Sequence, residues 1–201
     1  MHNLAVYLTQ CLVKNELISG DRREEYQYAV EVVLGKVVNY TTLLIIALIT
    51  ANLIPTVIFM LFFFSLRKRT GGYHAKTALG CYVGTIVSYL IVAGVVVPAV
   101  TGNLHVQLIA LLISIVLILT LAPVNHPNLG LNEEEMLENK RLGRKVLAVE
   151  VIVLGVMILL GLRTSVMLNV YVFIAYGISG IGMNGVLVCM GKWSMQEEKI
   201  D

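Results

Sequence analysis

A histidine and a cysteine seven residues apart, His74 and Cys81, are the two side chains of this sequence best suited to covalent chemistry. A thiol becomes a strong nucleophile only when it loses its proton, and a neighbouring imidazole can accept that proton. On one unbroken helix the two side chains would share a face but lie about 10.5 Å apart along the axis. That separation is too long for a hydrogen bond of about 3 Å, so the pair requires a break in the helix.

The residues around this pair can supply the break. Gly71-Gly72 permits a sharp bend just before His74, and Thr77 is a candidate N-cap for a new helix. Cys81 would then lie in the first turn of that helix. There the helix dipole and the basic cluster Arg67-Lys68-Arg69 both favour a thiolate. The same cluster could bind a carboxylate or stabilise an oxyanion.

Each of these residues also has a purely structural interpretation. A cysteine in a membrane helix commonly serves only as a small apolar side chain, and a basic cluster can be only a membrane anchor. No group that would orient the imidazole is identifiable, with Asn125 and the glutamates of the same later loop as candidates. No common zinc, nucleotide or serine-hydrolase motif is present, so we expect no metal and no other cofactor.

The composition places this polar segment in a membrane protein. Of the 201 residues, 57% are hydrophobic and only 14% are charged, whereas soluble domains carry roughly 25% charge. The net charge of +2 is small and the basic residues are clustered, so no nucleic-acid partner is indicated. Three widely spaced cysteines without a C-x-x-C argue against a disulfide framework and a zinc site. No cleavable signal peptide is expected.

The apolar pattern predicts an all-α, polytopic membrane protein with a single domain over residues 1–201. Residues 1–36 have apolar positions at helical spacing, which predicts amphipathic helices on the membrane surface. Membrane helices follow over 37–191, with a cytosolic tail at 192–201. One of six apolar stretches is too short to cross, since a crossing takes about 20 residues; its helix either continues into the basic cluster or enters the membrane only partly. The stretches are 37–54, 56–66 (the short one), 78–98, 104–122, 146–162 and 166–189.

Loop charges predict the orientation of the chain. If all six stretches cross the membrane, fourteen of the fifteen lysines and arginines fall on one side and only Arg163 on the other. Basic loops face the cytosol. Both termini and the segment that holds His74 and Cys81 are therefore predicted on the cytosolic side.

This segment resembles the accessory gene regulator B (AgrB) family, the membrane cysteine endopeptidases of bacterial peptide quorum sensing. The resemblance rests on Arg67, Gly72-Tyr73-His74-Ala75 and Cys81, on the chain length and helical membrane pattern, and on the Ala122-Pro123 start of the second inner loop. Position by position, His74 and Cys81 match the family's catalytic dyad. Arg67 and Gly72 match positions that the family needs for activity.

The resemblance also implies a reaction and a partner. Cys81 would attack an AgrD-like precursor peptide before its acidic tail, forming a thioester and releasing the tail. A thiol within the peptide would then close a thiolactone ring. From its charge, the cluster Arg67-Lys68-Arg69 is placed to hold the acidic tail, and Gly71 and Gly72 support the bend. The resemblance further implies a homodimer in the bacterial cytoplasmic membrane, with the lipid bilayer around it.

Two other functions fit the same sequence. The chain could be a peptide exporter or scaffold in which the central segment only anchors and binds. It could also be a cysteine peptidase that hydrolyses its substrate without cyclising it. Removal of the Cys81 thiol separates the first of these from the enzyme, and the mass of the product separates the second.

Overall fold

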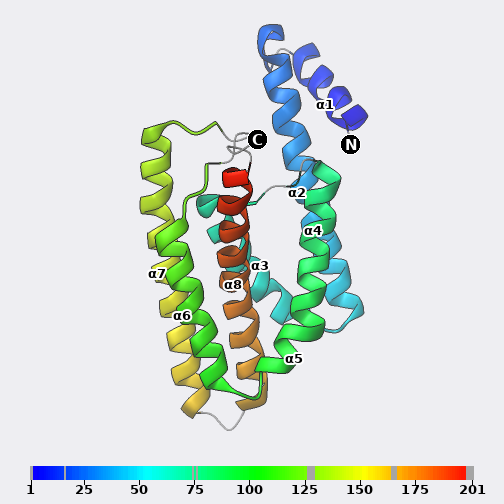
Figure 1. Cartoon of the computed structure of the whole chain (residues 1–201). Coiled ribbons are helices and arrows are strands. Elements are labelled where there is room, and N and C mark those ends of the chain that lie inside the picture. Colours follow the sequence, from blue (N-terminus) through cyan, green and yellow to red (C-terminus); the bar gives the residue numbers. More distant parts are fainter. Residues whose placement is uncertain are drawn as a thin grey trace.

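The structure of the chain is a computed structural model, and it describes residues 2–15, 17–73, 75, 77–125, 130–163 and 167–197. These residues are helical apart from short connecting segments, which confirms the all-α prediction (Figure 1). The helices are α1 His2–Lys14, α2 Arg23–Ile49, α3 Leu53–Thr70, α4 Ala78–Ile91, α5 Val97–Val100, α6 Leu104–Leu121, α7 Glu133–Arg163 and α8 Met167–Glu197. A 3-10 turn, Gly20–Arg22, precedes α2, and a π-helical turn, Val92–Val96, joins α4 to α5.

Five helical segments of the described chain are long and apolar enough to cross a membrane, which confirms the prediction of a polytopic membrane protein. They correspond to five of the six apolar stretches. These segments are Gly20–Ile49, Ala78–Val100, Leu104–Leu121, Glu133–Leu162 and Val170–Gln196.

The remaining apolar stretch lies in α3 and resolves the choice that the sequence left open. Its helix begins at Leu53 and continues through the basic cluster to Thr70, a length of 18 residues. At 1.5 Å per residue the helix is about 27 Å long, so α3 is comparable in length to a membrane span. The three basic residues occupy its last turn.

The N-terminal region differs in one respect from the expected separate surface helices. The second amphipathic segment continues without a break into the first apolar stretch, so that α2 is a single helix of 27 residues. The shorter α1 packs against α2, and His2 Nδ1 lies 2.6 Å from Glu31 Oε1. Ala5 is buried against α2, while Leu4 and Tyr7 remain exposed. That this exposed apolar face contacts the membrane surface stays a prediction.

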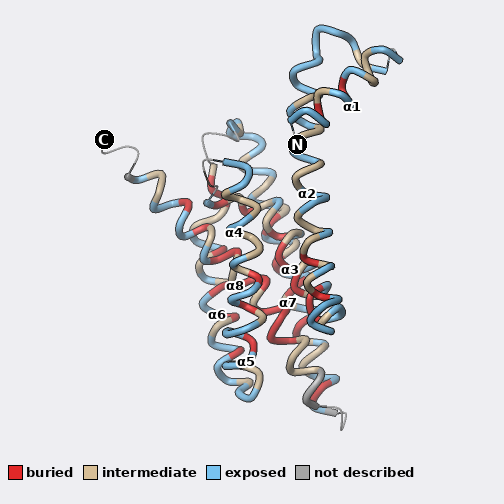
Figure 2. Tube along the Cα trace, turned by 90° about the vertical axis from the view of Figure 1, so that its right-hand side faces the viewer, coloured by how far each residue is buried: buried red, intermediate tan, exposed pale blue. Residues whose placement is uncertain are grey.

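Two helices, α3 and α8, form the centre of the bundle. Residues of both helices occur in each of the two buried hydrophobic clusters, one shared with α6 and α7 and the other shared with α2, α4 and α5. Figure 2 shows the buried residues concentrated around these two helices, whereas the N-terminal part of α2 is largely exposed. The connection that follows α3 is therefore attached to the most buried pair of helices in the molecule.

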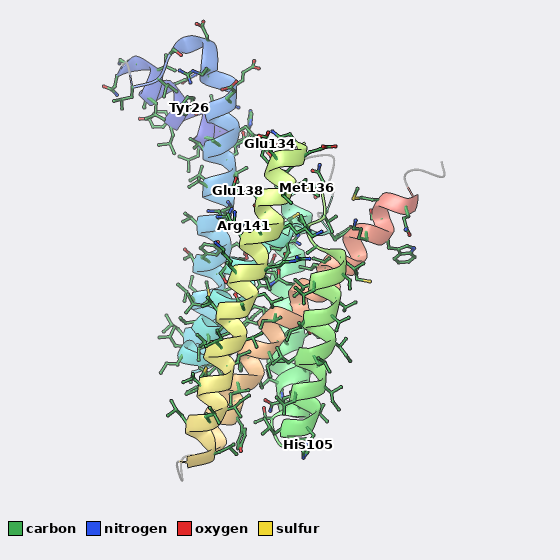
Figure 3. All side chains as sticks on the ribbon, turned by 90° about the vertical axis from the view of Figure 1, so that its left-hand side faces the viewer. Tyr26, His105, Glu134, Met136, Glu138 and Arg141 are labelled. Atoms are coloured by element: carbon green, nitrogen blue, oxygen red, sulfur yellow. The ribbon has the colours of Figure 1, made fainter. Side chains whose placement is uncertain are left out.

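The loops predicted to share one side of the membrane lie at one end of the bundle. The end of α3, the start of α4, the start of α7 and the end of α8 gather there (Figure 1). Figure 3 labels Glu134 and Arg141 at this end and His105 at the opposite end. The arrangement agrees with the loop-charge pattern, while the side that faces the cytosol stays a prediction.

Candidate functional site

The helix break predicted between the basic cluster and Cys81 is present. Helix α3 ends at Thr70, Gly71 caps it with φ of 62°, and Gly72 follows with φ of 109°. Both values lie in the region that glycine adopts at little cost and that other residues rarely adopt. The next helix, α4, begins only at Ala78.

Crowding adds a second reason for glycine at both positions. A Cβ atom on Gly71 would collide with the carbonyl oxygen of Val124. A Cβ atom on Gly72 would lie 2.5 Å from Arg67 Nη1 and 2.7 Å from the carbonyl oxygen of Leu187. The main chains of Val124 and Leu187, which are distant in the sequence, therefore pack directly against the glycine pair.

The side chain of Arg67 binds the main chain of the bend. Its guanidinium donates hydrogen bonds to the carbonyl oxygens of Gly71 and Tyr73. Arg67 follows the apolar part of α3, and burial lowers the pKa of its guanidinium to about 10, while the negative charge of a Cys81 thiolate would act in the opposite direction. The group therefore stays protonated at neutral pH and keeps its donors for the loop.

The other two members of the basic cluster are placed differently. Arg69 donates to Asn139 Oδ1 of α7 at 3.2 Å, which ties α3 to the charged start of that helix. Lys68 is exposed. Because Arg67 is used on the loop and Arg69 on α7, the three side chains do not form one common anion site.

Cys81 lies in the first turn of α4, as predicted. Thr77 caps this helix by accepting a hydrogen bond from the Gly80 N–H at 3.0 Å, which confirms the expected N-cap. Cys81 is half-buried, and its Sγ lies 3.8 Å from the Ala75 carbonyl oxygen, to which the thiol donates. This contact places the Ala75 carbonyl next to the Cys81 thiol. His74 and Lys76 lie outside the described residues, as does His126 of the later loop.

The connection between α6 and α7 supports the glycine bend from the other side. The Val124 N–H donates to the Thr70 carbonyl at 2.9 Å, and Val124 pairs with Gly71 in an isolated β-bridge. Asn125 uses both ends of its amide on Leu131, donating to its carbonyl at 2.8 Å and accepting from its N–H at 3.1 Å. Asn125, a candidate from the sequence for orienting the imidazole, therefore has its amide bonded to the main chain of Leu131.

The loop glutamates include a helix-capping residue. Glu135 Oε2 accepts from the Asn132 N–H at 2.9 Å, and the Glu135 N–H donates to Asn132 Oδ1 at 2.8 Å. This reciprocal pair is a capping box at the start of α7. Glu135 thus has a structural use at the start of the charged part of α7.

A cleft of about 480 Å³ lies beside the α6–α7 connection at the same end of the bundle. It combines apolar walls with two lysines and one glutamate, and Pro123 and Asn125 on its wall flank the Val124 that pairs with Gly71. The cleft therefore lies next to the glycine bend. The lining residues are Thr120, Leu121, Ala122, Pro123, Asn125, Leu131, Glu133, Met136, Leu137, Lys140 and Lys192.

One side of α8 completes the site, and sequence reasoning missed it. The Tyr73 N–H donates to the Leu187 carbonyl oxygen at 2.7 Å, and Gly191 lies against Gly72 and Tyr73. The signal in the sequence was a row of small and polar residues at helical spacing, Gly177, Gly180, Asn184 and Gly191. In an otherwise apolar span such a row indicates close helix contact, although it does not identify the segment that makes it.

Comparison with protein families identifies the chain. The family model described as accessory gene regulator B matches residues 5–190, which is nearly the whole sequence. The chain belongs to the AgrB family. A search of curated proteins and a search of solved structures found no match.

AgrB membership connects the site with a process. The family takes part in peptide processing in the accessory gene regulator system, its members are peptidase-like, and its partner is an AgrD-like precursor peptide at the membrane. The glycine bend, Arg67 with its two hydrogen bonds, and the start of α4 all fall within the residues that match the AgrB model.

Proposed function

We propose that this AgrB protein is a cysteine endopeptidase that removes the C-terminal tail of a precursor autoinducer peptide and cyclises the remainder to a thiolactone. The observation that carries the proposal is the placement of Cys81. It lies in the first turn of a new helix that follows a glycine bend, and its thiol donates to the Ala75 carbonyl. A nucleophile needs such a fixed approach, because productive geometry must be held within a fraction of an ångström.

In the first step Cys81 attacks the peptide carbonyl that precedes the tail. His74 takes the thiol proton and later gives it to the leaving amine, so that the C–N bond breaks while a C–S bond forms. The products are a thioester between Cys81 and the shortened peptide, and a free tail with a new amino terminus. No water is consumed in this step.

In the second step a cysteine thiol within the bound peptide attacks the thioester carbonyl. Its proton passes through His74 to the departing Cys81 sulfur, which restores the enzyme and closes the ring. A partly dry site favours this outcome, since scarce water leaves the acyl-enzyme intact until the internal thiol reaches it. The half-burial of Cys81 at the end of an apolar bundle supports this part of the proposal.

Arg67 and the glycines serve this chemistry by shaping the loop. Arg67 holds the carbonyls on both sides of Gly72, and Gly71 and Gly72 provide the bend. Lys68, exposed at the same end, remains the member of the basic cluster that is available to an acidic tail. We place the site and both termini on the cytosolic side, and we propose that the protein acts as a homodimer in the cytoplasmic membrane.

Co-expression with the precursor peptide tests the proposal directly. Cys81→Ala should abolish tail removal, while Cys189→Ala, which alters an exposed cysteine on α8, should leave it intact. Mass spectrometry of the product should show a ring that is lighter than the linear peptide by one water. Unchanged tail removal by Cys81→Ala would contradict the enzyme, and a linear product of the unaltered protein would contradict cyclisation.

An exporter or scaffold is the alternative function. Under that reading Cys81→Ala would process as the unaltered protein does, and only the appearance of peptide outside the cell would depend on the chain. The elaborate support of the 71–73 bend by Arg67, Val124 and Leu187 favours the enzyme, because binding alone does not demand so narrowly fixed a main chain.

A further inference from the structure

Asn184 of α8 is a fully buried polar residue in the middle of the helix pair α3–α8. Its Nδ2 donates to the carbonyl oxygens of Phe63 at 2.9 Å and Gly180 at 3.0 Å. Its Oδ1 accepts from the Thr70 hydroxyl at 3.5 Å. The bonds to Phe63 and Thr70 reach the C-terminal part of α3. Asn184 therefore holds the end of that helix against α8.

One turn further along α8, the Leu187 carbonyl receives the Tyr73 N–H at 2.7 Å. A carbonyl in a helix is normally reached only by the N–H four residues later, which here belongs to Gly191. A Cβ atom on Gly191 would lie 2.6 Å from both the Gly72 carbonyl carbon and the Tyr73 nitrogen. The missing side chain therefore opens the Leu187 carbonyl to the loop.

We propose that Asn184 and Gly191 are positioning residues for the reaction, an inference that rests on the proposed function. Asn184 holds the helix that ends at the bend, and Gly191 leaves room for the bend to contact α8. Tyr73 immediately precedes His74 in the chain, so the hydrogen bond from Tyr73 to Leu187 fixes where the segment leading to Cys81 begins. Neither residue touches the reacting atoms.

Ordinary helix packing is the alternative explanation, and Gly180 illustrates it. A Cβ atom on Gly180 would lie 2.9 Å from Phe62 Cβ and 3.0 Å from the Phe59 carbonyl, contacts that bring two helices together. Gly191 differs because its close neighbours belong to the non-helical loop. The inference depends on that difference.

Gly191→Ala tests the inference because its methyl group would meet the loop and not a neighbouring helix. Alanine stabilises a helix interior by about 0.5–1 kcal/mol relative to glycine, yet here its methyl group would push the loop away. The matched control is Gly155→Ala in α7, where an added Cβ meets no atom within 4 Å. Both variants are made in the full chain, reconstituted in lipid vesicles with the precursor peptide.

We expect Gly191→Ala to lower kcat for tail removal by about 10- to 100-fold, with KM within about twofold, because a small misplacement of reacting groups has this effect. Gly155→Ala should leave both constants unchanged. The midpoint of thermal unfolding should stay the same or rise in Gly155→Ala, whereas in Gly191→Ala the contact with the main chain of Gly72 and Tyr73 opposes the gain in helix stability. Equal kinetics in the two variants would overturn the inference.

A second variant covers the case in which Gly191→Ala does not fold. Asn184→Ala should also lower kcat with little change in KM. Its control is Ser114→Ala in α6, which removes a buried hydroxyl whose bond, among the described residues, is to the Ala110 carbonyl of its own helix at 2.7 Å. Equal kcat values for these two variants would also count against positioning by α8.

A measurement without peptide separates this inference from the proposed function. With Cys11 and Cys189 replaced by serine, the rate of Cys81 alkylation reports on the site itself. Gly191→Ala should change that rate severalfold relative to Gly155→Ala. If Cys81→Ala still removes the tail, the proposed function fails, and the alkylation rates continue to decide the positioning inference.

Discussion

The guanidinium of Arg67 donates a hydrogen bond to the main-chain carbonyl of Tyr73, six residues later and beyond a glycine bend. A second bond from the same guanidinium goes to Gly71. An arginine that recognises two carbonyls at once uses the planar fork of its donors, which lysine does not have. Arg67 is thus part of the fold of the site.

Arg67→Lys should therefore impair tail removal although it keeps the positive charge. We expect tail removal to fall by about tenfold or more, because one ammonium cannot hold both carbonyls in the same geometry. Arg141→Lys, an exposed arginine of α7 at the same end, should have no effect. Full activity in Arg67→Lys would show that only the positive charge matters.

Gly72→Ala should damage both stability and processing. Its φ of 109° is unfavourable for alanine, and the new Cβ would approach Arg67 and the Leu187 carbonyl. We expect a loss of about 1–3 kcal/mol in the free energy of unfolding, measured in detergent by denaturant. Gly35→Ala in α2, where a Cβ meets nothing within 4 Å, should keep or increase stability. A Gly72→Ala protein as stable as Gly35→Ala would contradict the description of the bend.

Asn125→Ala should change binding more than chemistry. Both ends of the Asn125 amide bond to Leu131, and both residues line the cleft of about 480 Å³. Loosening this wall should raise KM several-fold while kcat stays within about twofold. A hundredfold loss of kcat at unchanged KM would instead place Asn125 among the groups that act on the reacting atoms.

Glu150 presents a carboxyl group inside the span formed by α7. It is buried between Leu147 and Leu154, its Oε1 accepts from the Ser65 hydroxyl at 2.5 Å, and its Oε2 has no partner among the described residues. Ser65→Ala removes this bond, so we expect it to lower the free energy of unfolding by about 1–3 kcal/mol.

Glu150→Gln is the informative companion to that variant. Its amide oxygen can still accept from Ser65 while the ionisable group disappears, so thermal stability should stay the same or rise. Circular dichroism during heating in detergent would measure both variants. A large loss of stability in Glu150→Gln would mean that the charge itself has a partner, such as a second copy of the chain.

Much of the site could be predicted because its determinants are local in the sequence. The glycine pair predicts the bend, Thr77 predicts the start of α4, and the seven-residue spacing requires the break between them. The apolar stretches predict the spans in the same way, through composition over about 20 residues. The continuation of α3 through its basic cluster was left open, because an 11-residue apolar stretch fits both a crossing and a partial entry.

The sequence by itself determined the class of protein, the helix that carries Cys81 and the bend before it. Only the tertiary structure decided that Arg67 donates to the carbonyls of the bend, that Val124 pairs with Gly71, and that the Tyr73 N–H donates to the Leu187 carbonyl. The physical reason is the range of the forces involved. Helix periodicity and capping act within a few residues, whereas the contacts of Val124 and Leu187 join segments more than fifty residues apart. The bonds of Arg67 are short in sequence, but they need the carbonyls that the supported bend turns toward the guanidinium.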